Sequence, residues 1–188
     1  MAEYYFISQL PSLDGLGENS QIPITEDRFL ELANTFLKGK TLQEVLSLSL
    51  VPPISQEQST SSLIQTWNDA ERNLRLALAK VRADKLNKSF ALANKNLSAE
   101  LIKVASDAIE IDSPLQAEYF LLNYRLKFLE SIRPMDSFSQ DFIFYYGIKL
   151  KLLFRIKQFD TQIGKTEYAK IYSSIIRGDK VEENNERN

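Results

Sequence analysis

The sequence predicts an all-α protein, and three observations support this prediction. Residues 62–88 form one long segment in which apolar residues recur every three or four positions. Several further amphipathic segments each begin with a Ser or Thr that is typical of a helix N-terminus. Only one short aromatic run has the composition of a strand. We therefore expect a multi-helix bundle of about seven helices with a long central helix.

The run Tyr4–Ile7 is aromatic and β-branched, and Pro11 follows it, which predicts a short strand or an extended arm. Residues 14–24 contain glycine, asparagine and proline and predict a loop. The helices are placed by their capping residues and by the glycines or prolines that end them. They are expected at residues 25–38, 41–51, 62–88, 98–112, 113–133, 137–159 and 167–177.

The long segment 62–88 contains a heptad-like seam. Its apolar residues are spaced by four, three, four, three and four positions: Leu63, Trp67, Ala70, Leu74, Ala77 and Val81. A seam of this kind packs against another helix, and we expect that helix to belong to the same chain. Glu71 and Arg75 also form a favourable i, i+4 pair on this helix.

The domain organisation is predicted from the linker that separates the second and third helices. Residues 51–61 are rich in proline, serine and glutamine and form the clearest linker. We expect an N-terminal helical segment over 1–53, a main helical bundle over 54–177 and a polar, disordered tail over 178–188. The helices are expected to form one compact domain overall.

The absence of cysteine and histidine from the sequence excludes several kinds of chemistry. Disulfides, thiolate metal sites and catalysis by Ser-His-Asp or Cys-His groups all need one of these residues. Carboxylate or lysine catalysis and a Mg²⁺ or Ca²⁺ site on oxygen ligands stay open. We expect no enzymatic activity, no catalytic residues, no cofactor and no bound metal. The N-terminus lacks the pattern of a signal peptide and no segment could span a bilayer, so a cytoplasmic location is expected.

The charge is unevenly distributed although the net charge is only −2. Residues 1–62 carry eight acidic and three basic residues, whereas residues 63–96 carry three acidic and seven basic residues. Arg72, Arg75 and Arg82 fall near one face of the long helix. Aromatic residues are not interleaved with these cations, so a solvated face or contact with an acidic protein surface is favoured over nucleic acid.

Two further groups of residues have both a structural and a functional interpretation. Glu110, Asp112 and Glu118 surround a predicted helix start, where carboxylates commonly complement the helix dipole. The same three carboxylates are the candidates for a Mg²⁺ site in a hydrolase. The aromatic residues near 142–146 cannot all face one side of a helix. Either that helix is central in the bundle, or Phe144 and Tyr146 meet another protein.

Four segments of the chain resemble a bacterial family of unassigned function encoded in V-type (A/V-type) ATP synthase operons. These segments are MAEYYFISQLPSL, WNDAERNLRLALAKVRADKL, SPLQAEYFLLNYRLKFLE and FSQDFIFYYGIKLKLLFRIKQFDTQIGKTEYAKI. The resemblance implies a socket component of the C/d type, a helical protein that lies between the rotating stalk and the membrane ring. The chain departs from the family at Ser113–Pro114, where Asn–Pro is expected, and has no threefold repeat, so an assembly role also stays open.

The resemblance leads us to expect a non-catalytic subunit or assembly factor of a bacterial V-type rotary ATPase. Its expected partners are stalk or membrane-ring subunits, which would hold it at the inner membrane without insertion of its own. The expected partner-binding residues are Arg72, Arg75, Arg82, Phe144 and Tyr146. A free-standing helical adaptor and a carboxylate-dependent hydrolase are the alternatives.

Overall fold

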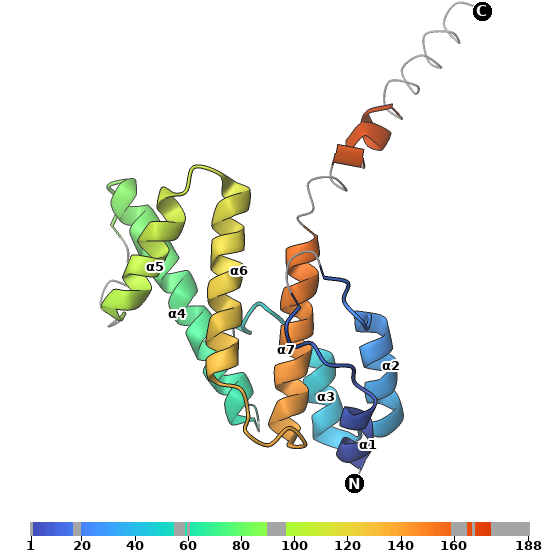
Figure 1. The fold of residues 1–188 in the computed structure, drawn as a ribbon. Helices are drawn as coiled ribbons and strands as arrows, with labels where there is room; N and C mark the ends of the chain where they lie inside the picture. The colour runs from blue at the N-terminus through green and yellow to red at the C-terminus, as the bar shows by residue number, and fades with distance from the viewer. Residues whose placement is uncertain are drawn as a thin grey trace, which may run out of the picture.

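The structure is a computed structural model that describes residues 2–16, 20–54, 59, 61–89, 97–158, 165–166 and 168–173. Seven helices are labelled in Figure 1: α1 (Ala2–Ser8), α2 (Glu26–Phe36), α3 (Gly39–Ser47), α4 (Ser62–Lys85), α5 (Ala99–Glu110), α6 (Pro114–Ser131) and α7 (Gln140–Lys157). Residues 165–166 and 168–173 are also helical. The described residues contain no strand, so the all-α prediction is confirmed.

The strand expected at Tyr4–Ile7 is wrong, because this segment forms α1. Phe6 and Ile7 are buried side by side, whereas Tyr4 and Tyr5 are both exposed. Adjacent residues of a strand point to opposite faces, so a strand with one exposed face would bury only one residue of this pair. A single helical turn can bury both, and the aromatic ring of Phe6 packs on Phe29 of α2.

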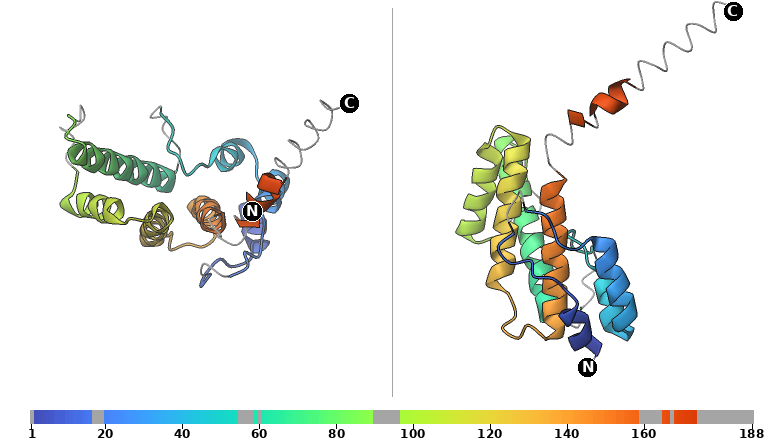
Figure 2. Two further views of the ribbon diagram at one scale, coloured as in Figure 1. Left: turned by 90° about the horizontal axis from the view of Figure 1, so that it is seen from above. Right: turned by 45° about the vertical axis from the view of Figure 1, so that its right-hand side comes forward.

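Helix α7 lies at the centre of the fold (Figure 1). It contacts α2 and α3 on one side and α4 and α6 on the other. Viewed from above in Figure 2, α5, α6 and α7 follow one another in a row, with α4 and α3 in a second row beside them. Residues 143–150 are all buried, so the whole circumference of α7 is covered over this stretch. The longest helix, α4, lies to one side of it.

The core divides into two apolar clusters. The inner cluster surrounds α7 and takes buried residues from α1, α2, α3, α4 and α6 as well. The outer cluster is much smaller and joins α4, α5 and α6 through Leu74, Ala77, Leu78, Ala105, Ala108 and Leu121. Because the inner cluster includes residues of α1–α3 together with α7, the N-terminal helices do not have a core of their own.

A buried ion pair separates the two clusters. Glu71 of α4 accepts two hydrogen bonds from Arg125 of α6, at 2.9 and 3.0 Å, and a third from Arg75 at 2.8 Å. Along α4, Trp67 on one side of Glu71 belongs to the inner cluster and Leu74 on the other side to the outer cluster. The expected pair of Glu71 and Arg75 is therefore present, and the packing partner of the α4 seam is within the chain.

Most helix starts in the structure agree with those predicted from the capping residues. The side chains of Thr25, Ser98 and Ser113 each accept a backbone hydrogen bond at the start of their helices. The helix expected at 41–51 is placed two residues late, because α3 begins at Gly39, where φ is +60°. Across the ranges that the structure describes, no helix is long and apolar enough to span a bilayer. The predicted tail, 178–188, lies outside those ranges.

Candidate functional site

Two of the three arginines of the predicted partner-binding face are engaged within the chain. Arg72 pairs with Asp69 at 3.0 Å and donates to the carbonyl of Pro53, also at 3.0 Å. Arg75 donates to the buried Glu71. Arg82 is exposed near the end of α4, and we find no partner for it in the described part of the chain. The face is thus weaker as a docking surface than its sequence indicates.

The prediction that Phe144 and Tyr146 bind a partner is wrong, because both are buried in the inner cluster. The hydroxyl of Tyr146 donates to the carbonyl of Pro11 at 2.8 Å, so its polar end is also satisfied within the chain. The sequence left a central helix and a partner surface equally open. The structure selects the central helix.

The three carboxylates considered as a hydrolase site do not form one. Glu110 accepts from Ser106 at 3.2 Å, and Glu118 faces Arg155 at 3.7 Å. Asp112 is exposed just before Ser113, which caps α6. Over the described ranges, no three Asp, Glu, His or Cys side chains gather closely enough to hold a metal ion.

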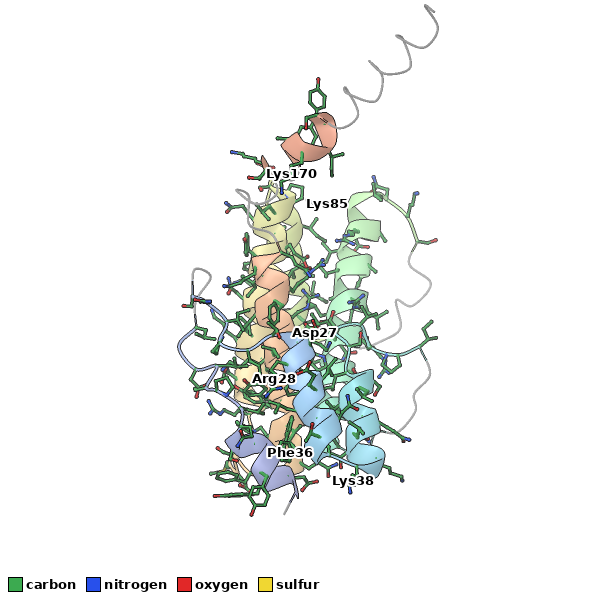
Figure 3. All side chains as sticks on the ribbon, turned by 90° about the vertical axis from the view of Figure 1, so that its right-hand side faces the viewer. Asp27, Arg28, Phe36, Lys38, Lys85 and Lys170 are labelled. Atoms are coloured by element: carbon green, nitrogen blue, oxygen red, sulfur yellow. The ribbon has the colours of Figure 1, made fainter. Side chains whose placement is uncertain are left out.

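The exposed surface that sequence reasoning missed lies at one end of the bundle. Tyr4 and Phe138 stack on each other with centroids 4.7 Å apart, and they are 54% and 49% exposed. Tyr5 packs edge-on against Tyr4, and it is also exposed. We call Tyr4, Tyr5 and Phe138 the aromatic surface. Tyr4 and Tyr5 belong to α1, which in Figure 3 lies at the same end of the bundle as Phe36 and Lys38, opposite the end marked by Lys85.

A cavity of about 210 Å³ adjoins one residue of the aromatic surface. Phe138 lines it, as do Ile7 and Leu10 of the N-terminal segment and Phe142 of α7. Its lining is mainly apolar, but charged residues also reach it. An aromatic rim over an apolar hollow is the form that protein-binding anchor sites commonly take.

The charged residues beside this cavity form one ionic network that ties the N-terminal segment to α6 and α7. The carboxylate of Asp14 accepts from Arg133 at 3.1 and 3.2 Å and from Lys149 at 3.0 Å. Lys149 also lies 2.6 Å from Glu130, and the hydroxyl of Tyr145 donates to Glu130 at 2.7 Å. These five residues are the ionic network. It fixes the loop that connects α1 to the rest of the molecule.

The pKa shifts within the ionic network follow from these contacts. Hydrogen bonds from Lys149 and Arg133 hold the pKa of Asp14 below its ordinary value. Burial disfavours the charges of Glu130 and Lys149 and is the largest single influence on each pKa, but the hydrogen bonds and charge interactions within the network together outweigh burial. The pKa of Glu130 is therefore lowered and that of Lys149 is raised. Burial and the bond to Glu130 raise the pKa of Tyr145 to about 12.

These shifts describe a structural network. The network joins the loop after α1, through Asp14, to Arg133 at the end of α6 and to Lys149 of α7. The sequence signal for the aromatic surface was the adjacent pair Tyr4–Tyr5, but its partner Phe138 is more than 130 residues away.

Comparison with known proteins identified no relative. The chain matches no family model, no curated protein and no solved structure.

Proposed function

We propose that this protein is a non-catalytic helical interaction protein, and that the aromatic surface is where it docks on its partner. The observation that carries this proposal is the exposed stack of Tyr4 on Phe138, beside a mainly apolar cavity that Phe138 lines. Large exposed aromatic side chains of this kind are enriched at protein interfaces. Because Tyr4 and Phe138 already stack on each other in the free protein, little ordering of these side chains is needed when a partner binds.

The proposed partner is a stalk or membrane-ring subunit of a bacterial V-type rotary ATPase. This part of the proposal rests on the four sequence segments that resemble the ATP synthase operon family. The opening segment, MAEYYFISQLPSL, contains Tyr4 and Tyr5, and the last segment begins at Phe138. The residues that carry the resemblance at these two places are therefore also the residues of the aromatic surface. In this role the protein would couple or organise the stalk between the catalytic head and the membrane ring.

Affinity purification of the full-length protein from its native host tests the proposal. Identification of V-type ATPase subunits in the purified material is the expected result. The double variant Tyr4→Ser/Phe138→Ser should reduce their recovery by at least about tenfold, because both aromatic anchors are lost. Circular dichroism should show that the variant keeps its helical fold, since both side chains are about half exposed.

Leu86→Ser is the matched control, because Leu86 is an exposed apolar residue at the far end of α4. It should leave recovery unchanged. The purification could instead recover a different protein complex that the same double variant no longer binds. That result would support the aromatic surface as the docking site but would show that the partner is not the ATPase. Equal recovery by the double variant and the control would contradict the proposed surface.

A further inference from the structure

The cavity that adjoins the aromatic surface is lined by Phe138, and we call it the Phe138 cavity. Its walls come from the N-terminal segment, from the turn before α7 and from α7 itself. Ser12, Ser137 and Phe138 are exposed and also line it, so the cavity opens to solvent beside the ring of Phe138. A side chain of a partner docked on the aromatic surface is therefore within reach of it.

The volume of the Phe138 cavity, about 210 Å³, suits one side chain rather than a whole small molecule. Pockets that hold drug-sized ligands measure about 300–1,000 Å³. An engineered apolar cavity of about 150 Å³ in another protein binds benzene. The Phe138 cavity therefore has room for one aromatic ring or one branched aliphatic side chain.

The charged side chains beside the cavity are paired with one another. Among the described lining residues these are Asp14, Arg133 and Lys149, and the carboxylate of Asp14 accepts hydrogen bonds from both cations. The Lys149 ammonium has three N–H donors. Oxygens of Asp14, Glu130 and Tyr145 lie 3.0, 2.6 and 3.2 Å from its nitrogen. With two acidic and two basic side chains, the ionic network is neutral in sum.

This pairing decides which kind of group the cavity favours. A charged guest would lose its hydration and would find the opposite charges beside the cavity already engaged, so its desolvation would be uncompensated. An uncharged apolar guest has no such cost, and it gains from contact with the apolar walls formed by Ile7, Leu10, Leu13 and Phe142. The lining therefore favours an apolar side chain over a charged one.

Hydrogen bonds between lining residues join the walls of the cavity in the free protein. The hydroxyl of Tyr146 in α7 donates to the carbonyl of Pro11 at 2.8 Å. Lys149, also in α7, donates to Asp14 at 3.0 Å. Both bonds link the N-terminal wall to the α7 wall. The cavity is therefore formed before a partner binds, and little ordering of its walls is needed on binding.

We propose that the docking partner inserts one uncharged apolar side chain, either an aromatic ring or a branched aliphatic group, into the Phe138 cavity. The inserted group would lie against Leu10 and Phe142, beside the exposed ring of Phe138. An apolar anchor that fills a pocket within a ring of other contacts is the usual arrangement of a binding hot spot. This proposal rests on the proposed function, because it takes the aromatic surface as the docking site.

Toluene is the probe for the cavity in the isolated full-length protein, because it is a single uncharged ring with one methyl group. On titration, the ¹H–¹⁵N cross-peaks of residues 7–14 and 137–146 should move and saturate, whereas those of α5 should not move. Benzylammonium and benzoate carry the same ring with a positive or a negative charge, so both should bind at least about tenfold more weakly. Equal binding of either ion, or no saturable shift in these residues, would overturn the proposal.

Ser137→Phe and Leu10→Trp each add apolar volume at the cavity, and we expect both to remove toluene binding. Ser106→Phe, on α5 and outside the cavity lining, is the matched control and should bind toluene as the unsubstituted protein does. In the affinity purification, the two cavity variants should lower recovery of the partner by at least about tenfold. Circular dichroism should show that they keep the helical fold. Toluene binding that both variants keep would place the probe elsewhere and would overturn the proposal.

The same purification separates failure of the cavity proposal from failure of the proposed function. The cavity variants could lose toluene binding and still recover the partner, while Tyr4→Ser/Phe138→Ser does not recover it. The partner would then dock on the aromatic surface without filling the cavity, and only the cavity proposal would be wrong. Normal recovery by Tyr4→Ser/Phe138→Ser would instead contradict the docking surface itself.

Discussion

The inner and outer apolar clusters are built from different kinds of contact. The inner cluster encloses α7 so fully that eight consecutive residues, 143–150, are buried. The outer cluster joins α4, α5 and α6 through one face of each, and half of its six buried residues are alanines. Small residues allow helices to approach closely, but each contributes little buried apolar area.

This difference indicates which part of the protein carries its stability and which part is peripheral. Among the labelled helices, α5 makes substantial contacts with only two others, α4 and α6. Helix α7 makes such contacts with four: α2, α3, α4 and α6. The aromatic surface and its ionic network are both attached to the α7 side. We therefore expect the proposed docking surface to be supported by the most stable region of the molecule.

The largest effect is expected from Phe144→Ala in the inner cluster. Phe144 is fully buried, and truncation of such a residue costs about 3–5 kcal/mol, partly from the cavity left behind. Urea denaturation followed by circular dichroism measures the free energy of unfolding. Ala108→Gly in the outer cluster should cost only about 1 kcal/mol. Similar losses for the two variants would contradict the difference between the clusters.

The next effect is expected from Glu71→Gln, which removes the buried charge between the clusters. Arg125 is then left buried without its carboxylate, and breaking a buried pair in this way costs about 3 kcal/mol. The substitution should accelerate backbone hydrogen exchange more in α5 than in α7, because it weakens the α4–α6 connection that supports α5. Glu31→Gln, on an exposed pair, should change stability by less than about 1 kcal/mol.

A smaller effect is expected from Gly147→Ala on the buried surface of α7. An added Cβ would lie 2.7 Å from Cδ1 of Leu48 and 3.3 Å from the ring of Phe29. We expect a loss of about 1 kcal/mol, since the end of the leucine side chain can shift. Adding Leu48→Ala removes the clashing atom, so the double variant should be more stable than the sum of the single changes predicts. If the free-energy changes of the two single variants simply add up in the double variant, then the contact between residue 147 and Leu48 does not limit the packing of α7.

The smallest effect is expected from pH acting on the ionic network. The pKa values of Asp14 and Glu130 are lowered in the folded protein, so their contribution is present above the ordinary carboxyl range. It is lost as the pH falls through that range toward the lowered values. Asp14→Asn should therefore reduce stability at pH 7 more than at pH 3. Urea denaturation at both pH values measures this, and a loss that does not depend on pH would contradict the assignment.

The sequence was sufficient for most of the fold because helix signals are local. Thr25, Ser98 and Ser113 each satisfy a backbone N–H at their helix starts, and the α4 seam follows from spacing alone. The exception at Tyr4–Ile7 has a tertiary cause. Its composition favours a strand, but Phe6 and Ile7 both join the inner cluster and Phe6 packs on Phe29 of α2, so tertiary packing outweighs local preference.

The candidate site was not predictable in the same way, because long-range packing decides which side chains are exposed. Phe144 and Tyr146 are aromatic residues of the kind enriched at interfaces, but both are buried in the inner cluster. The stack of Tyr4 on Phe138 and the contact of Asp14 with Lys149 join residues about 135 positions apart. A single sequence carries no signal for such pairs.

Hydrogen–deuterium exchange of the full-length protein, alone and in its co-purified complex, tests the proposed docking surface most directly. We predict slower exchange in residues 2–8 and 135–139 on complex formation, with no change in α5. Slower exchange confined to α4 and α5, with residues 2–8 unchanged, would show that the partner binds the arginine face and would contradict the aromatic surface.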